Sequence, residues 1–87
     1  MDRQSINDQL ELLRLKELFI SDIEIRSQMA AAICKGSEEP SPYHSFCELT
    51  QCKPTIAKHF AGLMMIELWL TPEEIKSERE RLNRMLL

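Results

Sequence analysis

The segment from Phe60 to Leu70 constrains this chain most, because almost all of it is apolar. Nine of its eleven residues are apolar, and Gly62 and Glu67 are the exceptions. At 3.6 residues per turn these side chains point in every direction around a helix, and a helix that is apolar all round has to be covered on every side. A chain of 87 residues has little other material for this cover. The segment therefore predicts burial against a second copy or a partner protein.

Composition and charge narrow the class of protein. The chain is 44% hydrophobic and 29% charged, which is typical of an ordinary folded domain. Its two Gly and four Pro leave few residues for turns, so we expect no β-structure. The net charge of −3 does not favour nucleic acid as a partner, although a local basic face is compatible with it. We expect one domain over residues 1–87, without a cofactor.

The N-terminus and the cysteines indicate a reducing compartment. Residues 1–5 are polar and do not form the apolar core of a signal peptide. Cys34, Cys47 and Cys52 are odd in number, which favours free thiols over a disulfide framework. The longest apolar run is far shorter than the roughly 20 residues of a membrane span. We therefore expect an intracellular protein, cytoplasmic or nuclear, with no membrane contact.

We predict one long N-terminal helix over residues 5–35. Ser5 is suited to cap its first amides, and Gly36 is suited to end it. The sequence from Ser21 to Glu24 reads as a capping box, so a break at this point is the alternative to a continuous helix.

The predicted N-terminal helix carries two apolar stripes. One comprises Ile6, Leu10, Leu13 and Ile20, and the other comprises Leu12, Leu15, Leu18 and Phe19. Two stripes imply two contact surfaces, one for the core of the chain itself and one for a neighbour.

A polar linker over residues 36–42, with Pro40 and Pro42, leads into a helical second half over residues 43–87. We predict a short helix from Tyr43 to about Thr50, then a central apolar helix over residues 53–70 with Pro54 in its first turn. After it, Thr71-Pro-Glu-Glu74 predicts the start of an amphipathic helix that ends near Met85.

A helix-turn-helix pattern begins at Phe46. A short helix and a turn lead into a helix that offers polar residues to DNA, namely Lys53, Thr55, Lys58 and His59, and apolar residues to the core, namely Ile56, Phe60 and Leu63. Residues 46–70 resemble winged-helix DNA-binding repressors, and their spacing is similar to that of the C-terminal domain of kleisins. The first resemblance implies DNA binding and the second protein binding. The turn after Leu49 is short for the motif, and a helix start stands where a wing would follow Leu70.

A zinc site and an active site are the other kinds of functional site that this sequence could contain. Zinc binds four Cys or His ligands in a tetrahedron, and the candidates are His44, Cys47, Cys52 and His59. On a helix, the spacing from Cys52 to His59 points the two side chains away from a common centre, and free Cys is often a small buried hydrophobe. The sequence contains no Gly-rich phosphate loop and no Gly-x-Ser-x-Gly motif. We therefore predict no metal, no small-molecule substrate and no enzyme.

Together these patterns predict an all-α, four-helix bundle that is dimeric or partner-bound. The first predicted function is that of a regulatory or adaptor protein acting through helix-mediated protein-protein interaction. The predicted interface comprises Leu12, Leu15, Phe19, Met65, Trp69 and Leu70. The alternative is a helix-turn-helix transcriptional regulator that dimerises through its N-terminal helix and contacts DNA through Lys53, Thr55, Lys58 and His59.

Overall fold

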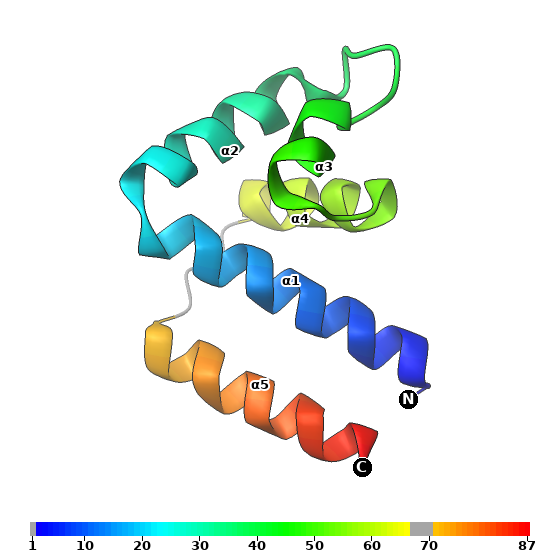
Figure 1. Ribbon diagram of the computed structural model, residues 1–87, viewed down its shortest axis with the longest axis vertical. Coiled ribbons are helices and arrows are strands. Elements are labelled where there is room, and N and C mark those ends of the chain that lie inside the picture. Colours follow the sequence, from blue (N-terminus) through cyan, green and yellow to red (C-terminus); the bar gives the residue numbers. More distant parts are fainter. Residues whose placement is uncertain (1, 67–70) are drawn as a thin grey trace.

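The computed structural model describes residues 2–66 and 71–87, with side chains described over 2–64 and 71–87 (Figure 1). Over these residues the chain forms five helices: α1 (Arg3–Ser21), α2 (Ile23–Gly36), α3 (His44–Thr50), α4 (Pro54–Ile66) and α5 (Pro72–Leu86). The predicted all-α class is confirmed for the described part of the chain, with five helices there in place of four. None of the described helices is long and apolar enough to cross a membrane.

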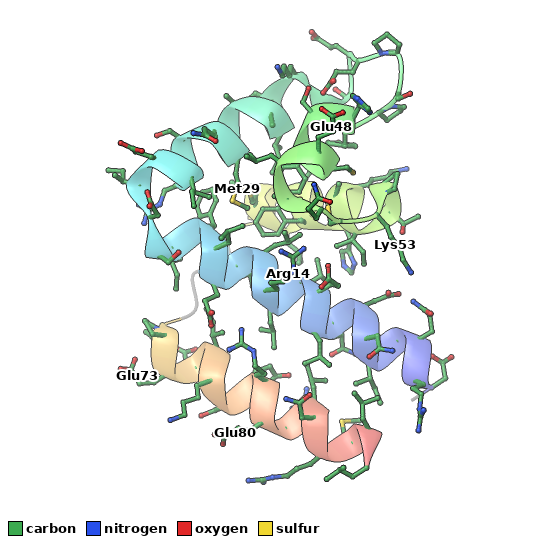
Figure 2. All side chains as sticks on the ribbon, viewed as in Figure 1. Arg14, Met29, Glu48, Lys53, Glu73 and Glu80 are labelled. Carbon is green, nitrogen blue, oxygen red and sulfur yellow. The ribbon has the colours of Figure 1, made fainter. Side chains whose placement is uncertain are left out.

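Helix α1 is the centre of the arrangement (Figure 1). Helices α2, α3 and α4 lie on one side of it, and α5 lies antiparallel to it on the other side. The two ends of the chain consequently lie at the same end of the molecule. Figure 2 shows Met29 directed from α2 into the space between the helices and Lys53 directed outward at the start of α4.

The predicted continuous helix over 5–35 is wrong, because the chain breaks at Asp22. Asp22 has an extended backbone, and its carboxylate accepts hydrogen bonds from the backbone N–H groups of Glu24, at 2.8 Å, and Ile25. Asp22, and not Ser21, is therefore the N-cap of α2. The Arg26 guanidinium donates to the Phe19 carbonyl at 2.9 Å, which satisfies one of the free carbonyls at the end of α1.

The start of α1 also differs from the prediction. The helix begins two residues before Ser5, and its N-cap is Asp2, whose carboxylate accepts the Ser5 N–H at 2.7 Å. The predicted start of the last helix is confirmed: Thr71 and Glu74 form a reciprocal capping box, and Pro72 occupies the first turn of α5.

The larger hydrophobic cluster joins α1, α2, α3 and α4. Phe46 stacks on Phe60 with ring centroids 5.6 Å apart, and Phe19 meets Phe60 edge-on at 6.3 Å. The cluster is completed by the buried residues Leu12, Leu15, Met29, Ala32, Ile56 and Ala57. A smaller cluster joins α1 to α5 through Ile6, Leu13 and Leu82, with Leu10 and Leu86 packed against it.

Both apolar stripes of α1 are therefore covered by the chain itself. The stripe that was expected to meet a neighbour faces α2, α3 and α4 instead. Leu12, Leu15 and Phe19 are 6%, 0% and 5% exposed, so these three predicted interface residues belong to the core and offer no surface to a partner. Because they are buried, these residues cannot supply the predicted dimer contact of the N-terminal helix.

The segment between α2 and α3 turns sharply at Gly36. The Tyr43 N–H donates to the Gly36 carbonyl at 2.9 Å, and the Tyr43 ring lies where a Cβ on Gly36 would stand. Tyr43 itself has a left-handed backbone, with φ of 61°. A residue without a side chain is therefore required at Gly36 for this close approach. The helix does end here, with Gly36 as its last residue, but without the left-handed glycine on which the predicted stop was based.

Candidate functional site

The connection between α3 and α4 is a turn of three residues, from Gln51 to Lys53. Gln51 has a left-handed backbone, with φ of 58°, and its N–H donates to the Cys47 carbonyl at 2.7 Å. The Lys53 carbonyl accepts the first helical bond of α4, from the Ala57 N–H at 3.0 Å. A helix-turn-helix joins its two helices by three or four residues. The turn that looks short in the sequence therefore has the length that the motif requires.

Helix α4 separates its polar from its apolar residues around its first two turns. Ile56, Ala57 and Phe60 are buried in the larger cluster, at 4%, 0% and 2% exposure. The four residues predicted to touch DNA, Lys53, Thr55, Lys58 and His59, are all exposed. Leu63 packs partly buried against the core, as expected for an inward-facing residue.

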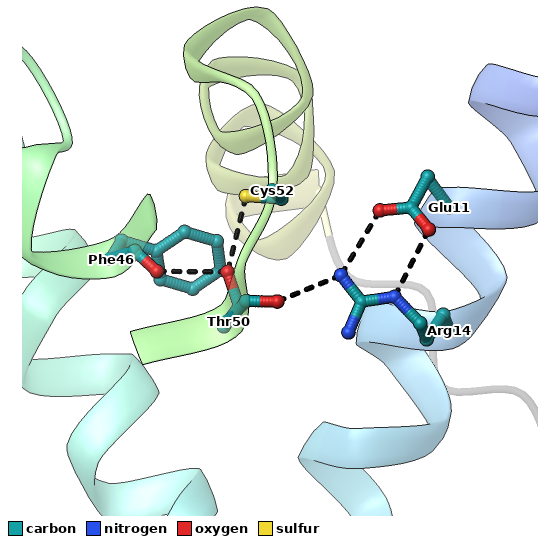
Figure 3. Close-up of polar contacts among 5 residues, drawn as sticks. All are labelled: Glu11, Arg14, Phe46, Thr50 and Cys52. Carbon is teal, nitrogen blue, oxygen red and sulfur yellow. Dashed lines mark hydrogen bonds and ion pairs between the residues drawn. The ribbon is translucent and has the colours of Figure 1, made fainter. Parts of the chain in front are cut away.

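The turn is tied to the central helix by Arg14. Its Nη2 atom donates to the Thr50 carbonyl at 2.8 Å, and Nε and Nη2 each donate to the Glu11 carboxylate at 3.0 Å (Figure 3). The hydrogen bonds that Arg14 donates to the Glu11 carboxylate raise the pKa of Arg14 above its usual range. The Thr50 carbonyl is one of the free acceptors at the C-terminus of α3, so the guanidinium satisfies it and fixes the turn against α1.

Thr50, the last residue of α3, belongs to the core. It is 2% exposed, and its hydroxyl donates to the Phe46 carbonyl at 2.8 Å. Sequence reasoning missed both Thr50 and Arg14. The one available signal was an arginine placed among the leucines of α1 with a glutamate three residues before it.

The charges around the turn are mixed. Asp8 and Glu11 of α1 line a cavity of about 380 Å³ together with Lys53 and four residues of α3, the turn and α4, namely Cys47, Gln51, Cys52 and Ile56. The Glu11 carboxylate is held by Arg14. Within the described ranges, neither Lys53 nor Lys58 forms a salt bridge, so both ammonium groups are available to an anionic ligand.

The four candidate zinc ligands do not converge. His44 lies 3.1 Å from the Glu48 carboxylate on the outer side of α3, and His59 is exposed on α4. Two of them, Cys47 and Cys52, line the cavity beside α1. Over residues 2–66 and 71–87, no group of three or more His, Cys, Asp or Glu is arranged to hold a metal ion.

The second half of the predicted protein interface lies outside the described residues. This applies to the side chain of Met65 and to Trp69 and Leu70. Among the described residues, the large exposed apolar side chains are spread over different elements: Ile23, Leu49, Met85 and Leu87. Single apolar residues on a surface are normal and do not by themselves indicate an interface.

No model of a known protein family, no curated protein and no solved structure matches this chain significantly.

Proposed function

We propose that this protein is a helix-turn-helix DNA-binding regulator in which α4 enters the major groove. The observation that carries the proposal is the three-residue turn between α3 and α4 together with the exposed polar residues that follow it. The major groove is wide enough to admit an α-helix, and recognition helices place the residues near their N-terminus against the base edges. Here those residues are Lys53, Thr55, Lys58 and His59.

The polar residues of α4 differ in the contacts they offer. Lys53 and Lys58 are suited to phosphate oxygens or to guanine, whereas the Thr55 hydroxyl and the His59 imidazole are suited to base edges. Buried Ile56 and Phe60 hold this face on a rigid helix, which improves the precision of a binding site.

The charge of the chain limits this mode of binding. A net charge of −3 repels DNA at long range, and two lysines neutralise few phosphates. We therefore propose that one chain binds weakly and that tight binding uses two copies on neighbouring half-sites, as other helix-turn-helix proteins do.

Selection from a pool of random duplexes at low salt tests the proposal, followed by fluorescence anisotropy on the enriched duplex. Lys58→Glu is the test variant, and Lys76→Glu is its matched control, since Lys76 is an exposed lysine on α5. We expect Lys58→Glu to weaken binding by at least about tenfold and to reduce the slope of log K against log salt by about one, because a phosphate contact is lost.

Lys76→Glu should change the affinity by no more than about twofold, since a single distant charge is screened. Equal losses in the two variants would contradict the assignment of α4, because they would reflect net charge alone. Failure to enrich any duplex would contradict DNA binding itself.

A second candidate function is protein-protein interaction through the end of α4. It is supported by Leu63 and Met64, which are only partly buried at the point where the apolar run continues towards Leu70. We propose a second copy of this chain as the partner, held by Met65, Trp69 and Leu70. Light scattering coupled to size-exclusion chromatography should give a dimer for the wild type and a folded monomer for Trp69→Asp. A monomeric wild type would contradict the proposed self-association.

A further inference from the structure

The C-terminal cap of α3 brings two of the three thiols of the chain together. Gln51 is left-handed and its N–H donates to the Cys47 carbonyl, which is the hydrogen bond of the left-handed capping motif. Cys52 follows Gln51, and its thiol lies close enough to Cys47 for a hydrogen bond between the two thiols to be among the contacts that raise the pKa of Cys47. Both are partly buried against the larger cluster, and both line the open cavity beside α1.

We propose that Cys47 and Cys52 are a reversible oxidation site, which a peroxide converts to an intrachain disulfide at the end of α3. The observation behind the proposal is that the cap places both thiols in the lining of the same open cavity. The proposal is independent of DNA binding, because it concerns the thiols and their oxidant alone. A disulfide requires Cα atoms within about 7 Å, which a contact between neighbouring turns of the chain can provide.

The neighbouring groups give the two thiols different roles. Thr50 Oγ1 lies 3.1 Å from Cys52 Sγ. The Thr50 hydroxyl is a hydrogen-bond donor within reach of two acceptors, the Phe46 carbonyl at 2.8 Å and the Cys52 sulfur, and its single proton can turn to either one. Once Cys52 has lost its proton, the Thr50 hydroxyl can turn and donate to the sulfur instead. Cys52 is therefore the sulfur that attacks the peroxide.

Cys47 is the sulfur that closes the disulfide. Burial, and after it the neighbouring Cys52 thiol, raise the pKa of Cys47 to about 11, so Cys47 is protonated at neutral pH. A protonated thiol is a poor nucleophile towards peroxide in solution. Against a sulfenic acid already formed on Cys52, however, Cys47 acts within the same chain and at short range.

The reaction balances in two steps. The Cys52 thiolate attacks one peroxide oxygen, the S–O bond forms as the O–O bond breaks, and the departing hydroxide takes a proton to become water. Cys47 then gives up its proton and attacks the Cys52 sulfur, so that the S–S bond forms and the S–O bond breaks with release of a second water. Two thiols and one hydrogen peroxide thus give one disulfide and two waters, and the two electrons pass from sulfur to peroxide.

The sequence allows a direct measurement. Trypsin cleaves after Lys35 and Lys58, but Lys53 precedes Pro54, so Cys47 and Cys52 remain in one peptide over residues 36–58. Cys34 is exposed on α2 and falls in a different peptide, where it serves as a solvent-accessible reference thiol. The folded Cys34→Ser protein is treated with one equivalent of hydrogen peroxide, alkylated with iodoacetamide and analysed by mass spectrometry.

We expect the 36–58 peptide to lose the mass of two hydrogens and to take up no iodoacetamide, and a dithiol reductant to restore both alkylation sites. The Cys47→Ser, Cys34→Ser variant should stop at a sulfenic acid on Cys52 that dimedone traps. The proposal is overturned if the peptide remains doubly alkylated while Cys34 of the wild type is oxidised. It is also overturned if oxidation yields only disulfides between chains. Circular dichroism before treatment verifies that each variant is folded.

Discussion

The two hydrophobic clusters that share α1 differ in size and in the helices they join. The larger one combines side chains from α1, α2, α3 and α4 around Phe19, Phe46 and Phe60. The smaller one joins only α1 and α5, through Ile6, Leu13 and Leu82. Local stability follows the density of buried apolar contacts, so α5 should open at a lower free energy than the helices of the larger cluster.

The difference also separates the candidate site from α5. Ile56 and Phe60 of α4 and Phe46 of α3 belong to the larger cluster, and Arg14 ties the turn to α1 on the same side. Helix α5 lies on the opposite side of α1 (Figure 1). Damage to the larger cluster should therefore destroy the site, whereas damage to the smaller one should leave it in place.

The largest effect is expected for Phe46→Ala in the larger cluster. Phe46 is fully buried and stacked on Phe60, so truncation removes the ring and leaves a cavity, at a cost of about 3–5 kcal/mol. Small domains have about 5–15 kcal/mol in total, so the variant should be partly unfolded at 37 °C if the wild type lies near the lower end of this range. Urea unfolding followed by circular dichroism measures the loss, with Phe46→Leu as the milder control. A loss below about 1 kcal/mol would contradict the central position of Phe46.

A smaller and more local effect is expected for Leu82→Ala in the smaller cluster. Leu82 is fully buried, but its cluster has few members and α5 can settle onto α1, so we expect about 2–3 kcal/mol, the lower part of the range for such changes. Amide hydrogen exchange should show that α5 loses protection while α3 and α4 retain theirs. Equal loss of protection in all three helices would show that the two clusters unfold as one.

The all-α class and the starts of α4 and α5 were predictable because their signals are local. Pro54 opens α4, and the capping box of Thr71 and Glu74 opens α5, as their chemistry requires. Which elements cover the two apolar stripes of α1 was not predictable. Periodicity shows that a face of a helix is apolar, but it does not show whether the same chain or another one covers it.

The exposed polar side of α4 was predictable from the spacing of Ile56 and Phe60, which fixes the buried face of the helix. The contact from Arg14 to the Thr50 carbonyl was not, because it joins residues 36 positions apart. The pairing of Cys47 with Cys52 depends on a left-handed Gln51, and a glutamine carries no sequence signal for this conformation, unlike Gly or Asn.

The next effect, of about 1 kcal/mol in unfolding free energy, is expected at the break between α1 and α2, where Asp22 and Ser21 are the two candidates for the N-cap of α2. Asp22→Ala removes the acceptor for the first amides of α2 and should destabilise the protein by about 1 kcal/mol. Ser21→Ala removes an exposed hydroxyl bonded to the Leu18 carbonyl and should have an effect within about 0.5 kcal/mol. Urea midpoints of the two variants give the comparison, and the reverse order would restore Ser21 as the cap.

The smallest effect is expected for the salt bridge between α1 and α5. Arg79 Nη2 lies 2.9 Å from the Glu17 carboxylate, and the two side chains are 36% and 52% exposed. Solvent screens such a pair, so Glu17→Gln should change the unfolding free energy by at most about 0.5 kcal/mol, and by less in about 1 M salt. A double-mutant cycle with Arg79→Gln isolates the coupling at both salt concentrations. A coupling free energy above about 1 kcal/mol would mean that the salt bridge, and not the Leu82 cluster, holds α5 to α1. The two clusters would then no longer differ in apolar packing alone.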